Sequence, residues 1–506
     1  MKKSVLKKGF IGLTTLFLLG ACGADSAGKG ATEKSKESSS SAEVASGASA
    51  TEYTDPSELK DSYDIIIVGG GGAGMAAALS AKEEGMNPVI LEKLPVAGGN
   101  TMKSSGGMNA SETKFQEAQG IEDSNDLFFE DTLKGGKETN DKELLRYLVD
   151  NSSPAIDWLD SMDITLDNIS YSGGASVKRI HRPNDGSAVG AYLVDGLVRN
   201  IYEKDIPLFV NTEVTKIIKD KEQVTGVEVK IDGETKTISG DAVVITTGGF
   251  GSNKEMIEEY RPELKDYVST TSEGSTGDGI RMVEEVGGAV VDMKQIQVHP
   301  TVVQDSGMLI SETVRGEGGI LVNQQGERFY NELETRDNVS KAITALPESY
   351  AYLIFDGALA ERAKQVDFYK DQGVVIEGET IEDLAKEIDM TPETLKETVD
   401  TWNKAVKDQS DEAFKRTTAM DYDLTTGPYY AIKIAPGIHH TMGGVKINTK
   451  TEVLDKDGSA VTGLYAAGEV TGGIHGQNRI GGNAVADIIV FGRQAGTQSA
   501  QFAAKK

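Results

Sequence analysis

Three short segments between Gln295 and Asp337 bring together side chains that bind anions and hold protons. They are His299-Pro300-Thr301, Ser311-Glu312-Thr313-Val314-Arg315-Gly316 and Asn331-Glu332-Leu333-Glu334-Thr335-Arg336-Asp337. Guanidinium groups are permanent cations that bind carboxylates, and a neighbouring carboxylate can exchange protons with them. Taken singly, each segment also fits an ordinary role: a capped histidine, an exposed ion pair or the acidic start of a helix. Together they predict a site that binds a carboxylate and moves a proton.

Two segments near the C-terminal end add cations to this set. Residues 437–444 contain His439 and His440, and residues 475–484 contain Arg479. Reducing an activated C=C bond requires a hydride on one carbon, a proton on the other and cations that stabilise charge on a carboxylate, where one preorganised donor can contribute about 3–4 kcal/mol. Arginine, whose pKa exceeds ~12, suits protonation of a carbanion-like base. The set fits such a reduction if the pocket is dry and covered by a lid.

The hydride requires a cofactor, and the stretch Tyr63–Lys93 predicts a dinucleotide cradle. Its first strand, Ile65–Val68, is wholly apolar, as in a strand buried on both faces of a parallel sheet. Gly69, Gly71 and Gly74 follow at the spacing that permits a tight turn, backbone approach to a pyrophosphate, and close packing of helix on strand. The N–H groups of the helix that follows would bind the phosphate.

A second strand predicted at Pro88–Leu91 ends at Glu92, about 20 residues beyond the glycines, where an acid can bind a ribose diol. An ordinary βαβ turn without a ligand has a similar pattern, and the motif alone does not distinguish FAD from NAD.

The segment Ala97–Asn109 contains two glycine pairs that flank small polar residues, which fits a surface loop or a backbone pressed against a flat ligand. With Gly98, Gly99, Ser104, Gly106 and Gly107 in place, the chain resembles the FAD-binding flavoproteins of the fumarate reductase and succinate dehydrogenase superfamily. Members with covalent flavin carry a histidine in this segment. The segment here has none, so the resemblance implies non-covalent FAD.

The segments around residues 295–337, 437–444, 463–470 and 475–484 resemble the active-site segments of the soluble flavocytochrome-type fumarate reductases, and the resemblance covers the body of the chain. It implies that two carboxylates of a C4 dicarboxylate are held by His299, Ser311, His439 and Arg479. It also implies that Arg336 donates the proton, with Glu312 and Arg315 as its relay to solvent. The family usually has threonine in place of Ser311 and often methionine in place of Leu309, so the substrate is less well defined than the reaction.

The glycine patterns and the resemblance together predict the FAD site. Glu469 resembles the family residue that binds the ribityl chain. The segment Ser275–Gly279 opens a helix, and it either contacts the flavin or only caps that helix. A final helix begins near Asn483-Ala484, and it either directs its N-terminus at the flavin or only packs against the rest of the domain. His181 is expected to be structural, and His440 and His475 are left open. The predicted cofactor-binding residues are Gly69, Gly71, Gly72, Ala73, Gly74, Glu92, Lys93, Gly98, Gly99, Asn100, Thr101, Ser105, Gly106, Gly107, Thr247, Gly248, Asp278, Glu469, Asn483, Ala484 and Val485.

Hydrophobic patterning predicts a helix over residues 193–203 and strands over 208–217, 224–231 and 242–246, with a hairpin turn at Asp232-Gly233. A helix beginning at Thr391-Pro392, with the threonine hydroxyl as its cap, places Leu395, Val399, Trp402 and Val406 on one buried face. The predicted fold is α/β: a Rossmann-like FAD-binding domain formed by residues 63–295 and 439–506, with an inserted α+β capping domain at 296–438.

Residues 1–22 read as an export signal, because a lysine-rich start precedes a short apolar run. Leu19-Gly20-Ala21-Cys22 resembles the lipoprotein cleavage box, with lipid attachment at Cys22; an ordinary signal peptide is the alternative. Residues 23–62, rich in Ser, Ala and Gly, predict a flexible tether. Cys22 is the only cysteine, which excludes a disulfide framework, a Cys-rich metal site and a c-type haem, so no metal site is predicted.

A net charge of −27 excludes a nucleic-acid-binding role, since that requires a basic face. The sequence as a whole predicts a lipid-anchored, extracytoplasmic FAD enzyme of the cell membrane that reduces fumarate to succinate in anaerobic respiration. Its electrons would come from a separate membrane or surface donor. The alternatives are the same chemistry on urocanate, methacrylate or another acrylate, a flavin-binding electron relay without its own substrate, and an oxidase or dehydrogenase that runs in reverse.

Overall fold

The computed structural model describes residues 53–506. The predicted signal peptide, Cys22 and the tether up to residue 52 lie outside the described residues. The last residues of the predicted tether lie against the body. The Thr54 N–H donates to the Leu208 carbonyl at 3.1 Å, and the Tyr53 hydroxyl accepts from the Ala97 N–H at 3.1 Å. The folded part therefore begins before the predicted boundary at residue 63.

The flavin domain contains an eight-stranded sheet. Its order is β18-β19-β8-β9-β1-β2-β6, with β7 paired to β8. Strand β1, buried throughout its Ile65–Val68 part, pairs in parallel with both β2 and β9, as a doubly wound fold requires. The strands are β1 (Ser62–Val68), β2 (Pro88–Leu91), β6 (Leu208–Phe209), β7 (Glu213–Asp220), β8 (Gln223–Ile231), β9 (Glu234–Ile245), β18 (Glu452–Leu454) and β19 (Ala460–Ala466).

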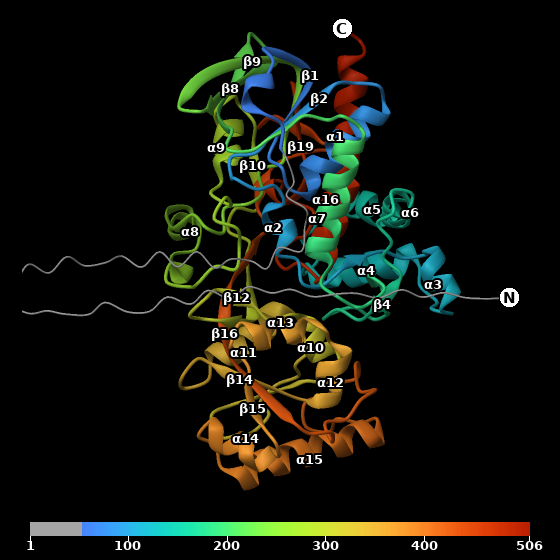
Figure 1. The fold of residues 1–506 in the computed structure, drawn as a ribbon, viewed down its shortest axis with the longest axis vertical. Helices are drawn as coiled ribbons and strands as arrows, with labels where there is room; N and C mark the ends of the chain where they lie inside the picture. The colour runs from blue at the N-terminus through green and yellow to red at the C-terminus, as the bar shows by residue number, and fades with distance from the viewer. Residues whose placement is uncertain (1–52) are drawn as a thin grey trace, which may run out of the picture. The chain divides into compact units, whose positions relative to one another are not determined.

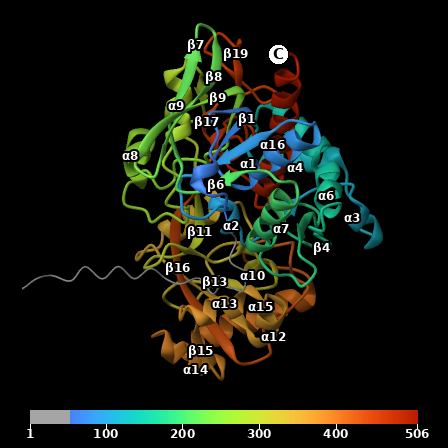
Figure 2. The same ribbon diagram turned by 45° about the horizontal axis from the view of Figure 1, so that its top comes forward.

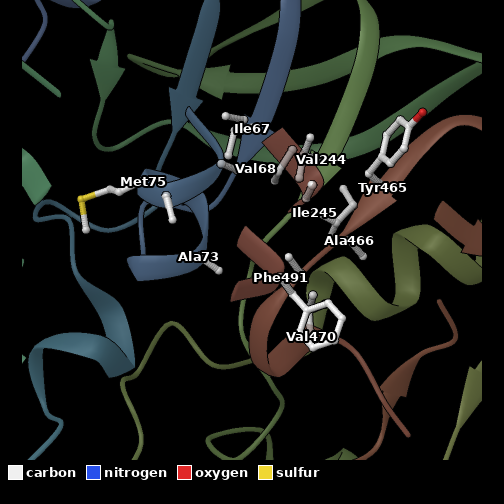
Figure 3. Close-up of a cluster of buried hydrophobic side chains, with 14 of the residues drawn as sticks. Ile67, Val68, Ala73, Met75, Val244, Ile245, Tyr465, Ala466, Val470 and Phe491 are labelled. Atoms are coloured by element: carbon white, nitrogen blue, oxygen red, sulfur yellow. The ribbon is translucent and has the colours of Figure 1, made fainter. Parts of the chain in front are cut away.

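Helices α1 (Gly72–Glu83), α7 (Val189–Glu203) and α16 (Asn483–Ala503) lie side by side against this sheet (Figures 1 and 2). Helices α1 and α16 cross closely, because a Cβ at Gly496 would lie 2.2 Å from the Ala77 carbonyl oxygen. Figure 3 shows Ile67, Val244 and Tyr465, from three adjacent strands, over residues of both helices. This core fixes the carboxyl ends of the strands, where the cofactor cleft lies.

The predicted strand over residues 208–217 is wrong as one element. The structure has β6 and β7 instead, because Asn211 adopts a left-handed backbone (φ 51°) and its N–H donates to the Leu94 carbonyl. The predicted turn at Asp232-Gly233 is confirmed, with both residues at positive φ. The strand predicted at 242–246 is the end of the longer strand β9.

The cap contains an antiparallel sheet in the order β12-β11-β16-β14-β13, with β15 also paired to β16, over a separate hydrophobic core. Helix α15 (Pro392–Asp408) buries Leu395, Val399, Trp402 and Val406 as predicted. Thr391 precedes it, but its hydroxyl makes no capping hydrogen bond, so that detail of the prediction is wrong. The strands are β11 (Ile296–Val303), β12 (Met308–Leu309), β13 (Ile320–Val322), β14 (Ala351–Asp356), β15 (Ile376–Gly378) and β16 (Tyr429–Thr441).

The fold class is confirmed: an α/β flavin-binding fold with an inserted α+β cap. The predicted cap boundary at residue 296 coincides with the start of β11, and the one at 438 lies within β16. None of the helices in residues 53–506 is long and apolar enough to cross a bilayer. The remaining elements are α2 (Gly99–Met102), β3 (Met108–Asn109), α3 (Lys114–Ala118), α4 (Asn125–Gly135), α5 (Lys142–Asp150), α6 (Ser152–Asp160), β4 (Asn168–Ser170), β5 (Ile180–Arg182), α8 (Lys254–Tyr260), α9 (Asp278–Glu285), β10 (Val290–Val291), α10 (Glu312–Gly316), α11 (Arg336–Thr344), α12 (Gly357–Arg362), α13 (Gln365–Asp371), α14 (Ile381–Glu387) and β17 (Gly444–Val445), with short 3₁₀ turns at Pro56–Glu58, Pro262–Leu264 and Gly468–Val470.

Candidate active site

A cleft of about 830 Å³ opens at the carboxyl ends of β1, β2 and β9. This is the position at which doubly wound folds bind dinucleotides. Most of the predicted cofactor residues line it: Gly69, Gly71, Gly72, Ala73, Glu92, Lys93, Gly99, Asn100, Thr101, Thr247, Gly248, Asp278 and Glu469.

The three fingerprint glycines meet different neighbours. Gly69 has a φ of 108°, and a Cβ there would lie 2.5 Å from the Thr246 carbonyl oxygen, so the tight turn requires glycine. A Cβ at Gly74 would lie 2.0 Å from the Gly69 carbonyl oxygen. A Cβ at Gly71 would meet nothing closer than 3.9 Å, so its backbone faces open space that suits a pyrophosphate. The cradle fits a dinucleotide.

Two consecutive ionisable residues directly after β2, Glu92 and Lys93, border the same cleft. The Glu92 carboxylate accepts from the Gly70 N–H at 2.7 Å and from the Leu94 N–H at 2.8 Å, and burial raises its pKa. The Lys93 ammonium group donates to Asp278 at 2.5 Å and thereby joins the end of β2 to the start of α9. The helix opened by residues 275–279 therefore borders the cofactor cleft through Ser275 and Asp278, and none of the described side chains caps its N-terminus.

Asn100 joins the first part of the flavin domain to the second. Its amide nitrogen donates to Glu469 at 2.8 Å and to Ser275 at 3.0 Å, and its amide oxygen accepts from the Ser272 N–H at 2.6 Å. Glu469 also accepts from the Thr441 N–H at 3.1 Å, and burial raises its pKa. The Thr247 hydroxyl, buried in the cleft wall, has no partner within residues 53–506, which leaves it free for a ligand.

Some lining residues were missed, because they occur singly on ordinary elements. Only Ser272 and Gly274, small residues just before the predicted 275–279 segment, gave a usable signal. The missed residues are Val68, Leu91, Leu94, Thr212, Val214, Thr246, Ser272, Gly274, Met282, Ala467 and Ile488, whereas Ser275 belongs to the segment for which flavin contact was one of the two expectations.

Eight predicted cofactor residues do not line this cleft: Gly74, Gly98, Ser105, Gly106, Gly107, Asn483, Ala484 and Val485. A Cβ at Gly107 would lie 2.2 Å from the His181 carbonyl oxygen, so this glycine permits close backbone packing. Asn483 is fully buried at the start of α16, and its amide oxygen accepts from Asn109 at 2.7 Å. The expected start of the helix is correct, and one turn later Ile488 contacts the cleft.

Arg336 and Glu312 form a two-point ion pair. The Arg336 Nε and Nη2 atoms donate to the two Glu312 carboxylate oxygens at 2.8 and 3.0 Å. Burial alone would raise the pKa of Glu312, but the guanidinium groups of Arg336, Arg315 and Arg479 lower it to about 2. Glu312 is therefore ionised at neutral pH and forms an ion pair with the Arg336 guanidinium group.

Arg315 continues this row of charges into the cap. One of its Nη atoms lies 3.6 Å from Glu312, and the other donates to the Glu332 carbonyl oxygen at 2.5 Å. Burial lowers the pKa of Arg315. The predicted series Arg336, Glu312, Arg315 is thus spatially continuous.

Gln297, which sequence reasoning missed, joins Arg336 to the segment that carries Arg479. Its amide oxygen accepts from Arg336 Nη1 at 2.9 Å, and its amide nitrogen donates to the Arg479 carbonyl oxygen at 2.7 Å. The pKa of Arg479 is lowered to about 9, mainly by burial and to a lesser extent by the positive charge of Arg336. The Arg479 Nε atom has no partner in the part of the chain that the structure describes.

The two histidines predicted to bind substrate face each other, with ring centres 5.2 Å apart. His439 exchanges a hydrogen bond with the Thr270 hydroxyl at 2.8 Å, whereas His299 Nε2 is buried without a partner among the described residues. Burial and the nearby positive charge of Arg336 hold the pKa of both rings well below 6.5, so both are neutral at pH 7. Ser311 caps helix α10 directly before Glu312.

The other three histidines are also buried. His181 contacts the Thr113 hydroxyl and the Arg179 carbonyl oxygen, each at 2.8 Å, in keeping with a structural role. His440 lies 3.5 Å from Glu469, and its ring centre is 5.5 Å from that of His475. His475 is within 3.2 Å of Asp487. His440 therefore lies beside a residue that lines the cofactor cleft.

Comparison with known proteins matches this geometry to one family. Residues 64–485 match the family model described as "FAD binding domain". The chain is 51% identical over 441 residues to an NADH:fumarate oxidoreductase of Klebsiella pneumoniae; the match spans 87% of this chain and 48%, about half, of that protein. It is 36% identical to a urocanate reductase of Eggerthella lenta, over 88% of this chain and 76% of that protein.

The fold matches that of a solved structure, the open conformation of a flavocytochrome c3 fumarate reductase. The TM-score is 0.73 at 45% identity, and the match covers 88% of this chain and 79% of that chain. The family model, the cleft and the glycine cradle identify FAD as the cofactor. The chain therefore belongs to the FAD-dependent oxidoreductases of the fumarate reductase flavoprotein family.

Proposed function

We propose that this chain reduces the C=C bond of a small unsaturated dicarboxylate, with fumarate as substrate and succinate as product. The observation that carries the proposal is the buried group of Arg336, Arg315 and Arg479 around Glu312. Three positive charges face one negative charge there, and the adjacent histidines are neutral. A dianion balances that excess, and the preorganised cations bind it without having to reorganise.

Each side chain has a distinct task in this proposal. Arg479, His299, His439 and Ser311 hold the two carboxylates and orient the double bond. Reduced FAD, when bound, supplies the hydride to one carbon. Arg336 gives a guanidinium proton to the other carbon, where it stays in the product, and a new proton from solvent then reaches Arg336 by way of Arg315 and Glu312.

The identity of the acid is the finer part of the proposal. Two arginines at the site favour a dicarboxylate over urocanate or an acrylate, which carry one carboxylate. Ser311 and Leu309, at the positions where the family usually has threonine and often has methionine, leave room for a different acid. The urocanate-reducing relative makes urocanate the first alternative to test.

We further propose that the enzyme acts at the extracytoplasmic face of the cell membrane, anchored by lipid at Cys22. The support is the apolar run and the Leu19-Gly20-Ala21-Cys22 box. The sequence of residues 1–506 has no C-x-x-C-H haem motif. We propose that its electrons come from a separate membrane or surface donor, in anaerobic respiration.

The test is anaerobic oxidation of reduced viologen by the FAD-loaded protein, with fumarate, urocanate and methacrylate offered separately. We expect fast turnover with fumarate, and a loss of about 10³-fold or more in kcat for Arg336→Ala. The matched control is Arg281→Ala, because Arg281 pairs with Glu259 and Glu284 on the surface. If the protein reduces urocanate or methacrylate but not fumarate, that acid is the substrate and the fumarate assignment is wrong. Flavin reoxidation by artificial acceptors, with no reduction of any of the acids, would favour the electron relay.

A further inference from the structure

The turn formed by Ile310 and Ser311 lies between strand β12 and helix α10 and is held from two sides. On one side, the Ile310 N–H donates to the Thr301 carbonyl at 2.9 Å, and the Thr301 hydroxyl donates to the Ile310 carbonyl at 2.8 Å. On the other side, the Ser311 N–H donates to the Tyr369 hydroxyl at 3.0 Å. The turn is therefore fixed by side chains from β11 and from α13.

Thr301 also connects this turn to a histidine of the site. Its N–H donates to His299 Nδ1 at 3.3 Å. Hydrogen bonds thus link His299 to Thr301, Thr301 to Ile310, and Ser311 to Tyr369, with the Ile310–Ser311 peptide bond joining the two parts into one series. Two of its members, His299 and Ser311, are residues to which the proposed function assigns the substrate carboxylates.

Tyr369 is a rigid anchor for the far end of this series. Its side chain is 2% exposed and belongs to the hydrophobic core of the cap. Burial raises the pKa of its hydroxyl to about 12, so the group stays protonated at every pH at which the protein works. Because the Ser311 N–H is also buried, a tyrosine without its hydroxyl would leave that donor unpaired.

We propose that Tyr369 is a positioning residue that holds Ser311, and with it the start of α10, in place for the substrate carboxylate. The inference rests on the proposed function of Ser311 and adds a residue of cap helix α13 to the site. Without the tyrosine hydroxyl, the Ser311 hydroxyl would sample orientations away from the substrate. The expected effect is on substrate binding, since the Arg336–Glu312 pair is left intact.

The first test measures the position of Ser311 without any substrate. Tyr369→Phe is compared with Tyr430→Phe, because Tyr430 is buried in the same core and its hydroxyl accepts from Lys370 at 2.8 Å. In the FAD-loaded proteins, hydrogen exchange of the peptide that spans residues 308–316 should be faster in Tyr369→Phe and unchanged in Tyr430→Phe. Equal exchange in wild type and Tyr369→Phe would overturn the proposal.

The second test is a double-mutant cycle with Ser311→Ala, read as KM and kcat for the best acceptor. Tyr369→Phe should raise KM about 3- to 10-fold, with kcat changed less than about 2-fold. The double variant should match Ser311→Ala alone, because the tyrosine acts through the serine. Additive effects, or an equal KM rise in Tyr430→Phe, would mean general loosening of the cap and overturn the proposal. If the wild type reduces no unsaturated acid, the proposed function fails, while the exchange comparison still decides whether Tyr369 holds Ser311.

Discussion

At the residue scale, Gln297 stands out because one amide serves two arginines. Its oxygen accepts from Arg336 and its nitrogen donates to the carbonyl oxygen of Arg479. The planar amide therefore fixes the direction of the proposed proton donor relative to the segment that carries the substrate clamp. The sequence does not reveal such a role. A glutamine on a strand can point to either face of the sheet, and its amide can bind partners through its oxygen or its nitrogen.

Gln297→Met keeps the length of the side chain but removes its hydrogen bonds to Arg336, to the Arg479 carbonyl oxygen and to Asn478. We expect kcat to fall about 10-fold or more, because the Arg336 Nη1 atom loses a buried partner and the guanidinium group can turn. Steady-state kinetics with reduced viologen measures the effect. Gln304→Met is the control, because the Gln304 amide contacts only backbone carbonyls near the end of β11. A kcat within 2-fold of wild type for Gln297→Met would contradict this role.

The depressed pKa of Glu312 predicts how stability depends on pH. Since the pKa is about 2 in the folded chain and 4.5 for a free glutamate side chain, the stabilisation is fully present above pH 4.5 and is lost as pH falls toward 2. Urea unfolding of wild type should therefore weaken more steeply from pH 5 to pH 3 than that of Glu312→Gln. Parallel curves would show that the ion pair does not carry this stability.

The charged residues of the site were predicted from sequence, and their supporting residues were not. Arg336, Glu312 and Arg315 were assigned to the site because their segments resemble the active-site segments of the fumarate reductase family. Gln297 and Tyr369 act through hydrogen bonds to partners distant in sequence, such as Arg336 at a separation of 39 residues and Ser311 at 58. Contacts of that kind depend on tertiary packing, which no local pattern encodes.

At the element scale, the C-terminal segment before α16 passes directly over the ion pair. A Cβ at Gly481 would lie 2.2 Å from Glu312 Oε2 and 3.0 Å from Arg336 Nη2. The segment thus encloses the pair from the flavin-domain side, while α10 and α11 supply its two partners from the cap.

Gly481→Ala should displace the Glu312 carboxylate without unfolding the chain. Gly481 is not among the glycines with positive φ, so alanine can adopt its backbone conformation. We expect kcat to fall about 10- to 100-fold, with FAD content unchanged by absorbance. Gly316→Ala is the matched control on α10, where a Cβ would meet nothing closer than 3.9 Å. Equal activity of the two variants would show that the pair tolerates the displacement.

Elements with strong local signals were predicted well, and those fixed by pairing were not. The apolar run of β1, the glycine turn and the proline at the start of α15 lie where the sequence predicts them. The break between β6 and β7 depends on hydrogen bonds from residues 211 and 212 to residues 94 and 92. The apolar pattern of residues 208–217 does not show that the first part pairs with β2 and the second part with β8.

At the scale of the whole molecule, the first described residues belong to the folded body. Tyr53 and Thr54 bond to Ala97 and Leu208, near the loop that leads to α2 and the end of β2. A chain that begins at residue 53 should therefore keep its FAD and its activity with artificial donors.

A chain that begins at residue 60 should lose those contacts and bind FAD more weakly. The comparison is thermal unfolding and FAD retention of the two truncated proteins, where we expect a lower Tm for the shorter one by several degrees. Identical behaviour would place the start of the folded body after residue 60.

The organisation of the cap could be predicted only in outline. Its helix α15 has a clear periodic face, but its sheet is formed by strands far apart in sequence, such as β11 with β16 and β14 with β16. The separate core of the cap follows from that pairing. The position of an insertion can be read from motif order, whereas its sheet order depends on long-range contacts.

The pairing of β11 with β16 has a mechanical consequence. The ladder between the two strands is interrupted between Gln297 and Val298 and again between His299 and Val302. A pair of strands bends most easily where the regular pairing is interrupted. The β11–β16 pair is therefore most flexible on both sides of His299. A dicarboxylate bound by His299, His439 and Arg479 would connect the two sides of this joint. Substrate binding would therefore also make the connection between the cap and the flavin domain more rigid.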